Sequence, residues 1–130
     1  MPSHRANAHG TACEYVLADH YGVDIKRGGK RVDTSWYDGL RDGVPWEFKA
    51  TAHRHADGNP GNFKIYKVYH SKLRQQGGWY GFAVYRKRGT GTQVLKMKAV
   101  PASKLPLLRW HGGGSHRGSK QGKLAIDDVF

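Results

Sequence analysis

The chain has 130 residues, a length typical of one domain that buries its own hydrophobic core. Its formal net charge of +12 indicates a polyanionic partner; nucleic acid is the first candidate, although ribosomal-type and membrane-surface proteins are also basic. The single cysteine, Cys13, excludes an intramolecular disulfide and a multi-cysteine zinc site. Because the sequence has no long apolar run and no secretory signal, we expect a cytoplasmic protein that crosses no membrane.

The first predicted element is a helix over residues 6–21, which Gly22 would end. The residues at the spacing of a buried helix face are Cys13, Val16, Leu17, His20 and Tyr21. Glu14 lies at the border of this face, from which it could lean over a sheet packed against the helix. Alternatively, Thr11 and Glu14 form a capping box for a helix that starts at Ala12, and Glu14 then has only a structural role.

A short strand at residues 23–25 and a turn at residues 27–30 precede a predicted hairpin within residues 35–51. The dipeptide Asp42-Gly43 favours a two-residue turn between its strands. Such a turn would pair Arg41 with Val44, Leu40 with Pro45, Gly39 with Trp46 and Asp38 with Glu47.

Side chains alternate along a strand, so the two faces of this hairpin differ. The apolar face would carry Tyr37, Val44, Trp46 and Phe48. The other face would carry Asp38, Glu47 and Lys49. Opposed carboxylates repel each other, and a bound divalent cation would explain their placement. A solvated strand face with an exposed ion pair between Glu47 and Lys49 is the alternative.

Residues 51–62 are polar and contain Gly and Pro, which predicts a loop. Its His53 and His55 have no Cys or third His close by, so we expect a solvated or phosphate-facing loop and no metal pair. A second helix is predicted over residues 63–76, or from Tyr66 onward. Its core face would hold Tyr66, Tyr69, His70 and Leu73, while a stripe of Lys67, Ser71 and Arg74 would rest on a phosphate backbone or lie in solvent.

Residues 79–85 are almost continuously apolar, which is typical of a central strand buried on both faces. After a basic turn, a strand over residues 93–100 would point Leu95, Met97 and Ala99 inward, and residues 101–108 would hold a helical turn. We assign residues 1–108 to a core domain and residues 109–130 to a basic, Gly/Ser-rich C-terminal tail. The end of this tail, residues 124–130, could dock as an edge strand or against a partner.

This order of elements, with its Asp…Glu-x-Lys hairpin, resembles the PD-(D/E)xK nuclease superfamily, and most of all its archaeal Holliday junction resolvases. The pair Gly10…Glu14 resembles the Gly-x-x-x-Glu element of their first helix, and residues 47–49 resemble the Glu-x-Lys that ends their hairpin. The chain departs from the family where the signature Pro-Asp is replaced by Tyr37-Asp38. Asp33 and Asp42 are rival carboxylates, although Asp42 is better used in the turn.

The resemblance implies an α/β fold with a restriction-endonuclease-like, nuclease-like core, a central mixed β-sheet flanked by helices. It implies that Asp38 and Glu47 hold Mg²⁺, for which Mn²⁺ can substitute, with Glu14 contributing directly or through water. Lys49 would position the attacking water or stabilise the transition state, so the implied catalytic residues are Glu14, Asp38, Glu47 and Lys49. Tyr37 and Thr51 are candidates for supporting roles next to them.

The function that follows is a Mg²⁺-dependent DNA endonuclease, selective for branched DNA and homodimeric by analogy with the resolvases. The alternatives are a restriction- or phage-type endonuclease on the same core, or a nucleic-acid-binding protein without catalysis. The residues expected to contact DNA are Lys64, Lys67, Arg74, Arg86, Lys87 and Arg88.

Overall fold

A mixed five-stranded sheet forms the middle layer of the protein, with the strand order β1-β2-β3-β5-β6. The computed structural model describes residues 4–25, 36–106, 108–112 and 120–130. The elements are α1 (His4–Tyr21), β1 (Asp24–Ile25), β2 (Gly39–Arg41), β3 (Val44–Ala52), β4 (Asn62–Tyr66), α2 (Lys67–Gln75), β5 (Trp79–Arg88), β6 (Gly91–Pro101), the 3-10 turn η1 (Ala102–Lys104), β7 (Gln121–Ala125) and α3 (Ile126–Val129). Strands β3 and β5 are parallel, and the other neighbours in this sheet are antiparallel.

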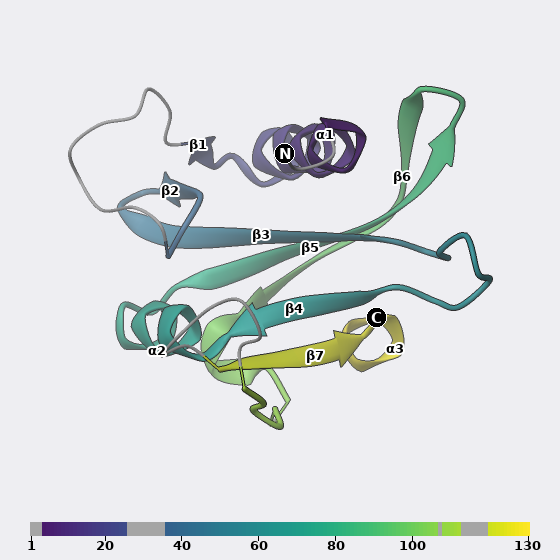
Figure 1. Ribbon diagram of the computed structural model, residues 1–130. Helices are drawn as coiled ribbons and strands as arrows, with labels where there is room; N and C mark the ends of the chain where they lie inside the picture. The colour runs from purple at the N-terminus through teal and green to yellow at the C-terminus, as the bar shows by residue number, and fades with distance from the viewer. Residues whose placement is uncertain (1–3, 26–35, 107, 113–119) are drawn as a thin grey trace.

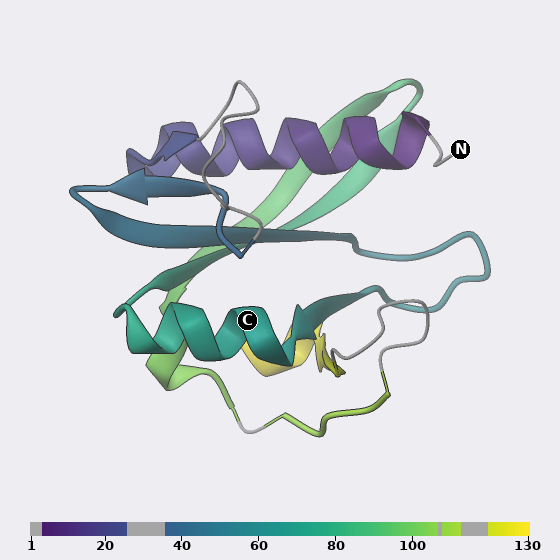
Figure 2. The same ribbon diagram turned by 60° about the vertical axis from the view of Figure 1, so that its left-hand side comes forward.

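The two faces of the sheet are covered differently. Figure 1 shows α1 along one face, and α2, α3 and the two-stranded sheet of β4 and β7 along the other. Figure 2 shows the same three layers after rotation, with α1 and α2 on opposite sides of β3. Each face has its own hydrophobic core, built around Leu17 and Trp46 on the α1 side and around Phe82 and Leu124 on the α2 side.

Helix α1 starts earlier than predicted and turns a different stripe towards the sheet. Cys13, Leu17 and Ala18 are buried, whereas Val16 is 39% exposed and His20 is exposed, so the prediction for these last two residues was wrong. The buried stripe of α1 includes Ala18, which was not on the predicted face, and Val16 and His20 lie outside this stripe.

The hairpin has the predicted turn and register. Asp42 and Gly43 both have positive φ, at 51° and 80°, as a two-residue turn of this kind requires. The three pairs from Arg41–Val44 to Gly39–Trp46 are confirmed. The fourth predicted pair, Asp38 with Glu47, is a correction: β2 begins at Gly39, and the Asp38 N–H donates to the Trp46 carbonyl. Tyr37 is a correction: it packs against the core on the α2 side, because β2 begins only at Gly39 and strand alternation does not extend back to Tyr37.

Strand β5 is central and buried, as predicted, while its neighbour β6 contains an irregularity. Val84 pairs with Lys96 but Tyr85 pairs with Val94, so Leu95 is an extra residue in β6. This bulge shifts the alternation, so Leu95 is 40% exposed and Val94 packs with Met97 against the α1-side core. The prediction that Leu95 points inward was therefore wrong.

Residues 63–65 form part of β4 and do not belong to the second helix. Phe63 and Ile65 are buried and Lys64 between them is exposed, a period-two pattern that indicates a strand. The alternative start near Tyr66 is confirmed, because α2 begins at Lys67.

The end of the chain packs onto the rest of the fold. Strand β7 pairs with β4, and Leu124 and Val129 are buried in the α2-side core. Docking of residues 124–130 beside a strand is therefore confirmed. The Gly/Ser-rich residues 113–119 lie outside the described residues, as do the predicted turn at residues 27–30 and the rival carboxylate Asp33. None of the described helices is long and apolar enough to cross a membrane.

Candidate active site

The candidate site lies where β2 stops and one edge of β3 is left without a strand. The last ladder pair is Gly39 with Trp46, and no described strand pairs with this edge of β3 beyond it. Asp38 occupies the gap: its N–H donates to the Trp46 carbonyl at 2.8 Å, and its Oδ2 accepts from the N–H of Phe48 at 2.7 Å. The carboxylate thus takes the place of the missing backbone acceptor, which fixes it beside β3.

Glu47 is a buried carboxyl on β3, only 8% exposed. Its Oε2 lies 3.4 Å from Nζ of Lys49, two residues further along the same face of the strand. Burial raises the pKa of Glu47 to about 9, against the opposing effect of Lys49, and the charge of Asp38 and a hydrogen bond with it raise the pKa further. The charge of Asp38 therefore adds to the effect of burial in making Glu47 harder to ionise.

Glu14 joins this cluster from α1. Burial raises its pKa to about 7, the charge of Asp38 adds to that rise, and Lys49 opposes it. The capping prediction for Glu14 was wrong, because α1 starts at His4 and Thr11 lies inside the helix. The packing of α1 on β3 is what brings Glu14 into the electrostatic reach of the hairpin.

Lys49 is held between an acid and an aromatic ring. Besides its contact with Glu47, its Nζ lies 5.3 Å from the ring centroid of Tyr66, at the end of β4. Both contacts restrict the ammonium group to the space between β3 and β4, so Lys49 presents one compact positive charge next to the carboxylates.

The four residues expected to act in catalysis are thus electrostatically coupled, but they do not form a ready three-ligand metal site. Within the described ranges, no three His, Cys, Asp or Glu side chains are grouped closely enough to hold a metal ion. The close pair is Asp38 and Glu47, and Glu14 interacts electrostatically with Asp38 and Lys49.

Tyr80, which the sequence had not linked to this site, adjoins Glu47 and in turn contacts His70. Tyr80 pairs with Glu47 across β3 and β5, and its hydroxyl lies 2.8 Å from Nδ1 of His70 on α2. Burial and the charge of Glu47 raise the pKa of Tyr80, so the phenol stays protonated. No local sequence pattern could have revealed this contact, because the pairing of β3 with β5 spans the whole of β4 and α2.

The six cations expected to contact DNA separate into different places. Lys64, Arg86 and Lys87 line one open groove, together with His53 and His55. An adjoining groove shares Lys64 and His55, and it reaches Lys49 and Lys123. In the first of these grooves, His53 Nδ1 is buried and has no hydrogen-bond partner among the described residues.

The remaining three expected DNA contacts lie elsewhere. Lys67 and Arg74 line a separate pocket beside α2. Arg88 lines none of these hollows, and its guanidinium lies 3.4 Å from the same Gln93 oxygen that Arg86 binds at 2.8 Å.

Comparison with known protein families gives one match. A family model described as a PD-(D/E)XK nuclease superfamily domain matches residues 1–130, so the chain belongs to this superfamily. No curated protein and no solved structure matches the chain. The mixed sheet flanked by helices is accordingly the restriction-endonuclease-like α/β fold of that superfamily, and the protein is a nuclease-like phosphodiester hydrolase.

Proposed function

We propose that this superfamily member is a Mg²⁺-dependent DNA endonuclease whose active site consists of Asp38, Glu47, Lys49 and Glu14. The observation that carries the proposal is the side-chain contact between Asp38 and the buried Glu47 at the open edge of β3, with Lys49 3.4 Å from Glu47. The net charge of +12 supports a nucleic-acid substrate.

The donor chemistry of this pair fits a hard divalent cation. Nucleases of this superfamily generally use divalent metals. Mg²⁺ is usually bound through one or two carboxylates, several waters and the substrate phosphate, so it does not need a third protein ligand. Asp38 and Glu47 supply the two carboxylates, and burial raises the pKa of Glu47 although Lys49 opposes the rise, so a bound cation would relieve the cost of ionising Glu47. Glu14 would then act through a metal-bound water.

Each residue of the chain has a separate task in this proposal. When bound, the metal would polarise the scissile phosphate and lower the pKa of the attacking water. Asp38 and Glu47 would hold that ion, and Asp38 is oriented for it by the Phe48 N–H. Lys49 would stabilise the charge that develops on the phosphate, in a position fixed by Glu47 and the Tyr66 ring.

The substrate arms would follow the basic grooves. The hollow that contains Lys49 continues through Lys64 to Arg86 and Lys87, and none of the described residues that line these two grooves is a carboxylate. We also propose selectivity for branched DNA and a homodimer that makes two coordinated cuts; both rest on the resemblance to Holliday junction resolvases.

The test is a cleavage assay with end-labelled linear duplex, single strand and four-way junction, with Mg²⁺, with Mn²⁺ and with EDTA. We expect cleavage of the junction, with a divalent metal only, and loss of cleavage in Glu47→Gln. The control is Asp57→Asn, which changes an exposed loop carboxylate. Metal-independent cleavage, or full activity in Glu47→Gln, would contradict the proposed site. Junction binding without cleavage by the unmutated protein would instead support a non-catalytic nucleic-acid-binding protein.

A further inference from the structure

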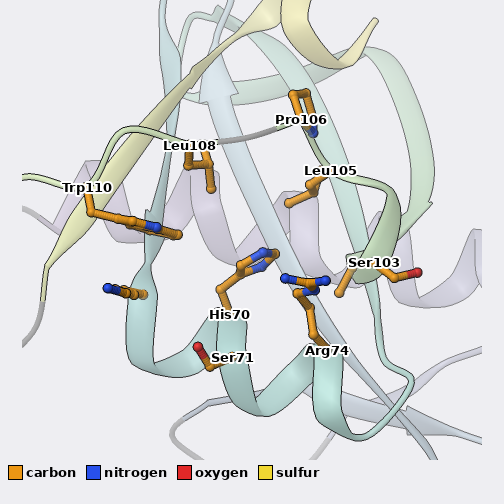
Figure 3. A pocket seen from close by; sticks show the side chains of 10 residues that line it. His70, Ser71, Arg74, Ser103, Leu105, Pro106, Leu108 and Trp110 are labelled. Carbon is orange, nitrogen blue, oxygen red and sulfur yellow. The ribbon is translucent and has the colours of Figure 1, made fainter.

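A separate pocket of ≈ 290 Å³ lies between α2 and the chain that follows η1. Figure 3 shows its lining, in which the rings of His70 and Trp110 and the guanidinium group of Arg74 gather near Leu105 and Leu108. The pocket is distinct from the grooves around Lys49, because it shares no lining residue with them.

The rim of the pocket is positively charged. Lys67 and Arg74 lie two turns apart on α2, both exposed, and Ser71 and Ser103 add hydroxyl groups. No carboxylate lines the pocket, and across the described residues neither Lys67 nor Arg74 forms a salt bridge. Two unpaired cations next to hydroxyl donors favour a ligand with a phosphate group.

The interior wall is aromatic and apolar. The rings of Trp110 and His70 lie 5.9 Å apart with an angle of 44°, and Leu105 and Leu108 complete the wall. His70 is buried and bonded to the Tyr80 hydroxyl, and burial and Arg74 lower its pKa, so its ring is a flat neutral surface at pH 7. Flat rings beside cations are the usual platform for a nucleobase whose phosphate is held at the edge.

The pocket lies close to the candidate active site. Lys67, at one end of it, directly follows Tyr66, whose ring contacts Lys49. His70, which also lines the pocket, contacts the Tyr80 hydroxyl, and Tyr80 is the register partner of Glu47 on β3. If a DNA phosphate lies at Lys49, a nucleotide bound in this pocket would therefore belong to the same DNA strand or to the DNA strand next to it.

We propose that this pocket binds one unpaired nucleotide of the substrate, with its base against Trp110 and its phosphate at Lys67 and Arg74. The inference rests on the proposed function, since it assumes that nucleic acid occupies the neighbouring grooves. A base inside a duplex is stacked and paired and cannot enter such a pocket, whereas a base at a gap, flap or branch point can. The pocket would thus make the protein select substrates with unpaired positions next to the cut.

The first test measures equilibrium binding in EDTA, so that no cleavage takes place, by fluorescence anisotropy. The probes are a duplex with a short single-stranded gap and the same duplex without it. We expect Arg74→Gln to weaken binding to the gapped probe about tenfold and to the intact duplex only about twofold. Lys72→Gln is the control, an exposed cation on the same helix that lines no pocket, and it should weaken both probes about twofold. Equal loss for both probes in Arg74→Gln would overturn the proposal.

A second test changes the ligand and leaves the protein intact. An abasic site at the gap should weaken binding of the unmutated protein about tenfold, while a photoreactive 5-iodouracil at the same position should crosslink to residues 105–110 on mass-spectrometric mapping. No loss with the abasic probe, or a crosslink confined to another segment, would overturn the proposal. Failure of the proposed nuclease function is distinguishable, because it would abolish cleavage while leaving these binding results unchanged.

Discussion

At the scale of single residues, Glu47 is the group most strongly perturbed by the fold among the proposed site residues. Its carboxyl is buried next to that of Asp38, and the nearby Lys49 does not compensate for the loss of solvation, as the rise of the Glu47 pKa to about 9 shows. Such a group makes the metal-free protein less stable when it is ionised. Carboxyl groups that destabilise the protein when ionised are usually found at functional sites, where a bound cation compensates for their charge.

The pH dependence of stability follows from this shift. The pKa of Glu47 rises from 4.5 to about 9 on folding, so the native state holds a proton that the unfolded chain has lost. The free energy of unfolding of the metal-free protein should therefore fall as the pH rises from 5 towards 9. Glu14, with a pKa of about 7, contributes in the same direction at lower pH.

Urea denaturation in EDTA at pH 5.5, 7 and 8.5 measures this effect. In Glu47→Gln, the free energy of unfolding should decrease much less between pH 7 and 8.5, because the variant lacks the group that titrates there. Asp57→Asn should behave as the unmutated protein does. The same pH dependence in Glu47→Gln and in the unmutated protein would show that Glu47 is not the titrating group.

Lys49 allows chemistry to be separated from binding. Lys49→Ala should lower the cleavage rate about a hundredfold or more, since a charge that stabilises the transition state acts on the barrier. DNA affinity should stay within about threefold, because one cation among many contributes little to binding. Lys123→Ala is the matched control, since Lys123 lines the same groove. Equal and modest losses of rate and affinity would reduce Lys49 to a phosphate contact.

At the scale of elements, the site depends on a strand that ends early. Strand β2 pairs with only the first part of β3, and the edge beyond Trp46 is closed by the Asp38 side chain. A longer β2 would satisfy the Phe48 N–H with a backbone carbonyl and displace the carboxylate. The short strand thus explains the position of Asp38.

Strand β7 should contribute to stability as part of the core. Leu124 is 2% exposed and packs in the α2-side core, so Leu124→Ala should reduce the free energy of unfolding by about 2–5 kcal/mol. Leu95→Ala, at the exposed bulge of β6, should reduce the free energy of unfolding by much less. Urea denaturation of both variants is the measurement, and equal effects would show that residues 121–130 do not belong to the folded core.

At the scale of the whole molecule, positive charge is distributed over several surfaces. Lys64 and Lys87 belong to the grooves that continue from Lys49, whereas Lys72 and Lys104 line none of the described hollows. Net charge alone attracts DNA to every surface, but only cations in contact with phosphates release counterions on binding.

The salt dependence of binding distinguishes these surfaces. The double variant Lys64→Gln/Lys87→Gln should reduce the slope of log affinity against log salt by roughly two, at about one for each lost phosphate contact. Lys72→Gln/Lys104→Gln changes the net charge equally and should leave the slope within about half a unit. Similar slopes for the two variants would place the duplex on another surface.

Local features of the sequence determined the hairpin and its three catalytic candidates. The Asp42-Gly43 turn sets the register, and alternation along β3 puts Glu47 and Lys49 on one face. Asp38 follows from its nearness in the chain, because it directly precedes β2 and its carboxylate bonds the Phe48 N–H. The family resemblance rested on the same short segment together with the order of elements. The prediction that Tyr37 lies on the apolar face of the hairpin was wrong, because β2 begins only at Gly39.

Contacts between distant segments were decided only by the tertiary structure. The packing of α1 selects Cys13 and Leu17 over Val16 and brings Glu14 to the site, and the parallel pairing of β3 with β5 places Tyr80 beside Glu47. The pocket at Trp110 likewise joins α2 to a segment some thirty residues later. Periodicity shows that a face is apolar, but the partner it meets depends on which combination of faces buries the most surface, and that is a property of the whole chain.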